Sequence, residues 1–97
     1  MTHYTAENFS GALGSVGSDW KWQSDALEAT FIFSDFKTAF AFMTQVAEVA
    51  ERLHHHPDWQ NSYNTVKVRL FTHDYNAVTD LDIALAIEIS ALVNDFT

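Results

Sequence analysis

Two stretches of the chain alternate apolar and polar residues with a period of two, the pattern of a half-buried β-strand. In residues 27–33 the odd-numbered positions are apolar, and in residues 65–72 positions 66, 68 and 70 are apolar. Residues 20–23 and 59–63 are predicted as two further strands. Ser24-Asp25 predicts a tight turn that pairs the first two strands.

Three segments are predicted as helices, and the first and last are recognised by their starts. Thr5 can cap a helix over residues 5–16, although three glycines in or beside it weaken a helix interior by roughly 1 kcal/mol each. Thr79 caps the last helix. Asp82 follows three positions later and supplies the carboxylate of a capping-box-like start.

The long central helix begins at Ser34 or Asp35, either of which can accept a hydrogen bond from the first turn. Pro57 disfavours helical conformation at the residue before it, so the helix is predicted to end around residues 53–55. Its apolar residues recur every three or four positions. They predict a core-facing stripe of Phe36, Phe40, Met43, Val46 or Ala47, Ala50 and Leu53.

This order of elements, α-β-β-α-β-β-α, predicts an α+β fold. Short links between successive strands imply antiparallel pairing, so we expect a four-stranded antiparallel sheet. The helices are expected to pack on one face of that sheet. The 97 residues show no internal linker or repeat, which predicts a single domain over residues 1–97.

Composition narrows the possible functions. Thirteen acidic and five basic residues give a formal net charge of −8, so we expect no direct binding to nucleic-acid phosphates. The chain has no cysteine, which excludes disulfides, thiolate metal sites and a cysteine nucleophile. The longest apolar run, residues 83–93, contains Glu88 and is shorter than the about 20 residues of a membrane span. The first residues lack a signal-peptide pattern, so a cytoplasmic protein without membrane association is expected.

The apolar surface of the helices exceeds what one small domain can cover. The last helix is apolar on nearly all sides, and the long helix carries Phe42 and Val49 away from its main stripe. A second subunit is the expected cover, because a large exposed apolar patch promotes association. Closed symmetric assemblies are the usual result. We therefore predict a homodimer or homotetramer.

The candidate chemistry lies in a histidine cluster, since four of the five histidines fall between positions 54 and 73. His54-His55-His56 is predicted at a helix C-terminus, where the helix dipole favours protonated imidazole. His73 ends a strand. Glu51 precedes His55 by four positions and would share its helix face if the helix continues. A charged and a neutral histidine could then act as acid and base near neutral pH.

The same residues allow other interpretations. The triplet could be a solvated helix end or a weak metal site. Neighbouring helix positions point about 100° apart, which disfavours three ligands from His54, His55 and His56. His73-Asp74 could be a strand-end turn, and Asp82 only a helix-start acid. Trp59 is either a packing residue or a pocket wall.

Three motifs occur together along the chain: Glu51-x-x-x-His55-His56-Pro57-Asp58-Trp59-x-Asn61-x-Tyr63-Asn64-x-Val66, then Thr72-His73-Asp74, then Asp82-x-x-Leu85-Ala86. They are preceded by Phe33-x-Asp35-Phe36, Ala39-Phe40-x-Phe42-Met43 and Val46-Ala47-x-x-Ala50-Glu51. Together these motifs resemble the pterin-4a-carbinolamine dehydratases, a family also known as the dimerisation cofactor of a hepatocyte nuclear factor. The resemblance covers about residues 20–87.

The resemblance implies the α+β fold described above and a hydro-lyase activity. Family members remove water from 4a-hydroxytetrahydropterin and give quinonoid dihydropterin without a metal or other cofactor. This step recycles the cofactor of aromatic amino-acid hydroxylases, which implies a functional link to such an enzyme. The resemblance also implies functional residues: catalytic His55, His56 and His73, pterin-lining Pro57, Thr72, Asp74 and Tyr75, and supporting Glu51 and Asp82. We interpret His55, near Glu51, as the acid.

Three departures from the family pattern are visible. His54 stands where the family commonly has another polar residue, and the glycine-containing N-terminal segment has no strong match. Ala77 replaces a loop glycine, which puts the geometry of the loop after His73 in doubt. Two rival functions stay open: a protein-binding module that stabilises a transcription-factor dimer, and a small metal-binding protein.

Overall fold

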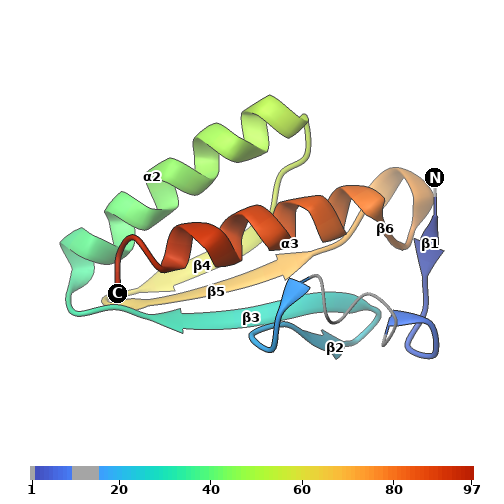
Figure 1. Cartoon of the computed structure of the whole chain (residues 1–97), viewed down its shortest axis with the longest axis horizontal. Helices are drawn as coiled ribbons and strands as arrows, with labels where there is room; N and C mark the ends of the chain where they lie inside the picture. Colours follow the sequence, from blue (N-terminus) through green and yellow to red (C-terminus); the bar gives the residue numbers. More distant parts are fainter. Residues whose placement is uncertain (1, 10–15) are drawn as a thin grey trace.

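The computed structural model describes residues 2–9 and 16–97, and its main body is a sheet with two helices on one face (Figure 1). The elements follow the predicted order from residue 20 onwards. They are β1 (His3–Tyr4), β2 (Lys21–Gln23), β3 (Ala26–Ile32), α2 (Phe36–Leu53), β4 (Asp58–Ser62), β5 (Thr65–Leu70), the short 3₁₀-helix η2 (His73–Tyr75), β6 (Val78–Thr79) and α3 (Asp80–Val93). The α+β prediction is confirmed.

The large sheet has the strand order β2-β3-β5-β4, and every neighbouring pair is antiparallel. The predicted turn joins β2 to β3 with Gln23 directly opposite Ala26. Both turn residues have positive φ, 50° at Ser24 and 62° at Asp25, as in the two-residue hairpin turns that match strand twist. The sheet prediction is therefore confirmed, including its tightest connection.

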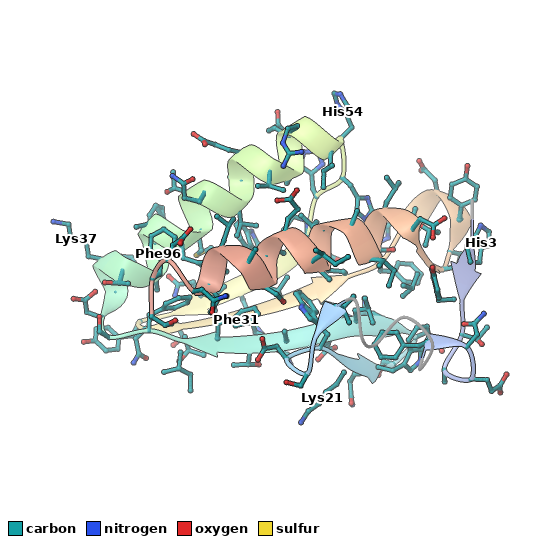
Figure 2. The ribbon with its side chains drawn as sticks, in the orientation of Figure 1. His3, Lys21, Phe31, Lys37, His54 and Phe96 are labelled. Carbon is teal, nitrogen blue, oxygen red and sulfur yellow. The ribbon has the colours of Figure 1, made fainter. Side chains whose placement is uncertain are left out.

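Strands β3 and β5 form the centre of the sheet and give it two different faces. Leu27 and Phe31 are paired with Leu70 and Val66, and all four side chains are buried under the helices. The opposite face is charged, and Lys21 points away from the helices there (Figure 2). The period-two alternation predicted from the sequence thus separates a core face from a charged face.

Helix α2 begins as predicted but buries a different stripe. The Asp35 side chain accepts a hydrogen bond from the Thr38 N–H at 2.8 Å, which satisfies one free donor of the first turn. The buried residues are Ala39, Phe42, Val46 and Ala50. Phe36 and Phe40 are about half exposed and lie against each other. The stripe prediction is wrong at these two positions and at Phe42.

The reason lies in the aromatic packing under the helix. Phe42 is fully buried, with its ring centroid 5.7 Å from that of Phe31 and 4.8 Å from that of Phe33. Two sets of apolar residues in α2 follow three- and four-residue spacing, so periodicity alone does not distinguish the inward set. The position of the Phe31 and Phe33 side chains on the core face selects Phe42.

Helix α3 begins with the predicted capping box. The Thr79 hydroxyl accepts from the helix start, and Asp82 accepts from the Thr79 N–H at 2.9 Å. Trp20 is buried and donates its indole N–H to Ser90 Oγ at 2.8 Å, which ties the chain before β2 to α3. No helix in residues 2–9 and 16–97 is long and apolar enough to cross a membrane.

The N-terminal segment agrees with the sequence prediction only in part where it is described. Strand β1 pairs with β6 in a separate two-stranded sheet, which is too short to show alternation in the sequence. Thr5 O accepts from the Phe9 N–H at 2.9 Å, so one helical turn follows Thr5. Residues 10–15 of the predicted helix lie outside the described residues.

Candidate active site

A hollow of about 250 Å³ lies where α2 ends and α3 begins, beyond the last residue of β5. Residues 54–56, residues 71–75 and Leu81 line it. The motif residues His55, His56 and His73 therefore surround one hollow, although β4 and β5 separate them in sequence.

The end of α2 determines how the histidine triplet is presented. His54 takes a left-handed conformation, with φ 53° and ψ 39°, and its N–H points back to Ala50 O and Glu51 O. The His55 N–H bonds to Ala50 O at 3.0 Å, so the last carbonyls of the helix are satisfied. His54 projects from the free end of α2 (Figure 2), whereas His55 turns inward and is buried.

The buried His55 is held by Asp82. Its Nε2 lies 2.5 Å from Asp82 Oδ1, while Asp82 Oδ2 accepts from Thr72 Oγ1 at 2.7 Å and from the Thr79 N–H at 2.9 Å. Asp82 is fully buried, and a buried carboxylate needs such partners to offset its lost hydration. Asp82 thus both completes the capping box of α3 and contacts a histidine of the hollow.

The exposed His56 is paired with Glu51, with 2.5 Å between Nε2 and Oε2. The hydrogen bond from His56, and then its charge, lower the pKa of the Glu51 carboxyl. This corrects the prediction that Glu51 lies beside His55. The helix stops at Leu53 and the left-handed His54 reverses the chain, so His56 comes back to the Glu51 side. Proximity to Glu51 therefore does not identify His55 as the acid.

His73 lies on η2, at the opposite wall of the hollow, and is exposed. Its Nε2 is 3.4 Å from Asp58 Oδ2, and its ring packs edge-on against Phe71 with centroids 5.3 Å apart. Phe71, Leu81 and Asp58 were not among the residues proposed from the sequence for the site, although Asp58 belongs to the quoted motif. The signal for Phe71 was available, since Arg69, Phe71 and His73 share the period of two along β5 and its continuation.

The other candidate residues divide into rim, support and packing positions. Thr72 is buried at the floor, and Asp74 and Tyr75 are exposed lining residues. Trp59 lies opposite Val68 and packs on the core, outside the residues that line the hollow. Pro57 is likewise outside that lining and connects α2 to β4.

The loop after His73 closes in spite of the alanine at position 77. Thr72 and Ala77 form a bridge with N–O distances of 2.9 and 3.3 Å, and Asn76 takes the left-handed conformation at φ 51°. Asparagine tolerates that conformation better than most residues. The position that needs positive φ is therefore occupied by Asn76, and Ala77 does not disturb the loop.

The arrangement provides imidazoles that can give and take protons at one solvent-accessible hollow. Each of the three motif histidines has a carboxylate at its Nε2: Asp82, Glu51 and Asp58 respectively. At His55 and His56 the carboxylate lies within hydrogen-bond distance and can accept the Nε2 proton, which leaves Nδ1 to exchange a proton with a ligand. At His73 the contact with the carboxylate is an ion pair at 3.4 Å. Within the described residues, no three His, Asp or Glu side chains form a group that could hold a metal ion.

The fold is that of a small α+β protein, and three histidines gather in one hollow where α2 ends, α3 begins and the chain leaves β5. The family model described as pterin 4 alpha carbinolamine dehydratase matches residues 2–92. A relative from Bradyrhizobium diazoefficiens that bears the name of this dehydratase is 50% identical over 90 residues, covering 91% of this chain and 89% of the relative. The chain belongs to the pterin-4a-carbinolamine dehydratase family.

Solved structures agree with this assignment. A crystal structure from Brucella melitensis, described as a transcriptional coactivator/pterin dehydratase, is 41% identical with a TM-score of 0.88 and covers 95% of this chain and 99% of that chain. A pterin dehydratase-like protein described as a RuBisCO assembly factor of the alpha-carboxysome is 21% identical with a TM-score of 0.68, covering 80% of this chain and 93% of its own. The second likeness concerns the fold alone.

Proposed function

We propose that this protein is a hydro-lyase that removes water from 4a-hydroxytetrahydropterin. The observation that carries the proposal is the hollow on which three histidines converge, each with its own carboxylate at Nε2. Membership of the dehydratase family supports the same substrate class. Catalytic roles are proposed for His55, His56 and His73.

The reaction needs one proton donor and one proton acceptor at the hollow. The bond between ring carbon 4a and its hydroxyl breaks, and an imidazolium supplies the proton with which the hydroxyl leaves as water. A neutral imidazole takes the proton from the adjacent ring nitrogen, whose electron pair forms the new double bond of the quinonoid dihydropterin. General acid–base assistance of this kind typically contributes about 10²–10⁴-fold in rate. The reaction therefore requires neither an oxidant nor an acceptor for a transferred group.

The residues around the hollow suggest how the pterin is held. Asp74 and Tyr75 line the hollow and are exposed, so they are proposed to contact the ring edge and its face. Thr72 and Asp82 fix the floor through their hydrogen bond at 2.7 Å. Pro57 is proposed to set the direction in which the chain leaves the histidine triplet. The proposed product would be reduced again for use by an aromatic amino-acid hydroxylase.

A homodimer or homotetramer is proposed as the working form. Phe36 and Phe40 on α2 and Ile87 on α3 are large apolar side chains left 41–52% exposed. Such side chains on neighbouring helices favour association. Phe42, which was expected to face a partner, is in the core instead.

A second candidate function is a protein-binding module that stabilises a transcription-factor dimer. It is favoured by the description of the Brucella melitensis neighbour as a transcriptional coactivator as well as a pterin dehydratase. The exposed pair Phe36 and Phe40 on α2 is a surface that an apolar helix could contact. Under this alternative, a variant with both phenylalanines replaced by serine would lose the partner.

The direct experiment is catalysis on chemically generated 4a-hydroxytetrahydropterin, followed by absorbance. Acceleration of water loss by the purified protein supports the proposal. A rate equal to that of the spontaneous reaction would contradict it.

A further inference from the structure

His73 is the most exposed of the three motif histidines, and its orientation is not set by burial. Its side chain is 71% exposed, against 10% for His55. His73 also sits on a 3₁₀-helix of only three residues, which restrains a side chain less than a long helix does. A side chain that exchanges protons with a bound substrate must be held in place by other contacts. A displacement of about 1 Å can lower the reaction rate by about 10²-fold.

One restraint comes from β4. Asp58 is its first residue, directly after Pro57, and the Oδ2 atom lies 3.4 Å from His73 Nε2. Asp58 is opposite Arg69 in the register of β4 and β5, so its backbone position is fixed by the sheet. The carboxylate therefore reaches His73 from a rigid strand and not from a loop.

A second restraint comes from β5. The Phe71 ring meets the His73 ring edge-on, with an interplanar angle of 76° and centroids 5.3 Å apart. Phe71 is in turn held by Arg69, whose guanidinium carbon lies 5.7 Å from the Phe71 centroid. Arg69 is anchored by Glu28 Oε2 at 3.5 Å and donates to Ser24 O at 2.9 Å. The His73 ring is thus bordered by a carboxylate and an anchored aromatic ring.

We propose that Asp58 is a positioning residue for His73 in the proposed dehydration, with Phe71 as the second support. The Asp58 carboxylate attracts the Nε2 side of the imidazole at 3.4 Å and favours one rotamer, which leaves Nδ1 free to exchange a proton with the substrate. The inference rests on the proposed function. An exposed ion pair contributes little to global stability, so the effect of Asp58 on His73 can be separated from any effect on folding.

The test compares Asp58→Ala with Asp58→Glu and with Asp19→Asn, a control that removes an exposed carboxylate at a distance from the hollow. Three-bond NMR couplings report χ1 of His73, and steady-state kinetics separate kcat from KM. For Asp58→Ala we expect couplings averaged over rotamers and kcat lower by about fivefold, which is ~1 kcal/mol at 1.4 kcal/mol per tenfold. KM should stay within about twofold. Asp58→Glu should restore a single rotamer in part, and Asp19→Asn should behave like the unsubstituted protein.

An unchanged His73 rotamer in Asp58→Ala would overturn the proposal, and so would a changed rotamer with unchanged kcat. If the unsubstituted protein shows no dehydratase activity, the proposed function fails. The couplings would still decide whether Asp58 orders the His73 ring.

Discussion

His55 Nε2 lies 2.5 Å from Asp82 Oδ1, although 27 positions separate the two residues. The contact joins the end of α2 to the first turn of α3. It also places a fully buried carboxylate behind a histidine that lines the hollow. One residue therefore serves the stability of the α2–α3 junction and the geometry of the site.

Replacing Asp82 should destabilise the fold. Asp82→Ala removes the acceptor for His55, Thr72 and the Thr79 N–H, and breaking a buried charged pair costs about 3–5 kcal/mol. Asp82→Asn keeps one acceptor and should cost about 1–3 kcal/mol. Urea unfolding measures both losses. The comparison variant is Asp80→Asn, which changes an exposed acid in the same helix turn whose carboxylate accepts from the Thr2 N–H and the Tyr4 hydroxyl instead of from the buried site residues. Equal losses for Asp80→Asn and Asp82→Asn would reduce Asp82 to a helix-start acid.

The three histidines should matter for turnover far more than their neighbour. His55→Ala, His56→Ala and His73→Ala are each expected to lower kcat by roughly 10²-fold or more, because each removes a proton-transfer group. His54→Asn keeps a residue that tolerates the left-handed helix end and should change kcat by less than about threefold. Circular dichroism should confirm that each variant is folded. Similar losses at all four positions in folded proteins would show that the catalytic group is wrongly assigned.

The pairing of Glu51 with His56 should be visible in its titration. The hydrogen bond from His56 is the largest cause of the lowered pKa of Glu51, so in His56→Ala this pKa should rise towards its ordinary value. Carboxyl carbon NMR follows the titration directly. A pKa of Glu51 that is the same in both proteins would contradict the pairing.

The lowered pKa of Glu51 also predicts how the stability of the fold depends on pH. Because the pKa of Glu51 is lowered in the folded state, its contribution to stability is complete when the pH is above the ordinary pKa that the carboxyl has in the unfolded chain. This contribution is lost as the pH falls through the lowered pKa of Glu51 in the folded state. Acid unfolding of Glu51→Gln should therefore show a weaker pH dependence in that range than the unsubstituted protein. His56 and Glu51 are both exposed, so the difference should be small.

The exposed apolar side chains should make the protein associate. Light scattering coupled to size exclusion is expected to show a dimer or tetramer of the 11.0 kDa chain at micromolar concentration. Phe40→Glu should shift the equilibrium towards the monomer, because a charge would then be buried in the contact. Gln45→Glu, exposed on α2 and about 140° around the helix from Phe40, is the matched control for added charge. A stable 11 kDa species of the unsubstituted protein would defeat this prediction.

The sequence predicted those parts of the fold in which a residue pattern is compatible with only one local structure. The alternation in β3 and β5 identified the core face, and Thr79 with Asp82 marked the start of α3. It did not identify the inward side of α2, because Phe40 and Phe42 fit equally regular stripes. That choice depends on contacts with Phe31 and Phe33 across the core. The pairing of β1 with β6 joins segments of two residues, which carry no period.

The family motif grouped His55, His56 and His73, and these residues line one hollow together with His54, but the sequence did not predict their partners. Glu51 was assigned to His55 on the assumption of a continuous helix, and the left-handed His54 changes that geometry. Asp58 reaches His73 only because β4 and β5 are paired in one register. Such contacts between distant segments follow from packing, and local spacing does not contain them.

Histidine acid–base catalysis at this hollow is tested most directly by the rate of water loss from 4a-hydroxytetrahydropterin in the presence of excess chelator. The unsubstituted protein should accelerate the reaction fully under these conditions, since the histidines supply both acid and base. A protein carrying His55→Ala, His56→Ala and His73→Ala together should leave only the small effect of binding, at least about 10²-fold less. No acceleration by the unsubstituted protein, or activity that chelator removes and zinc restores, would contradict histidine acid–base catalysis at this site.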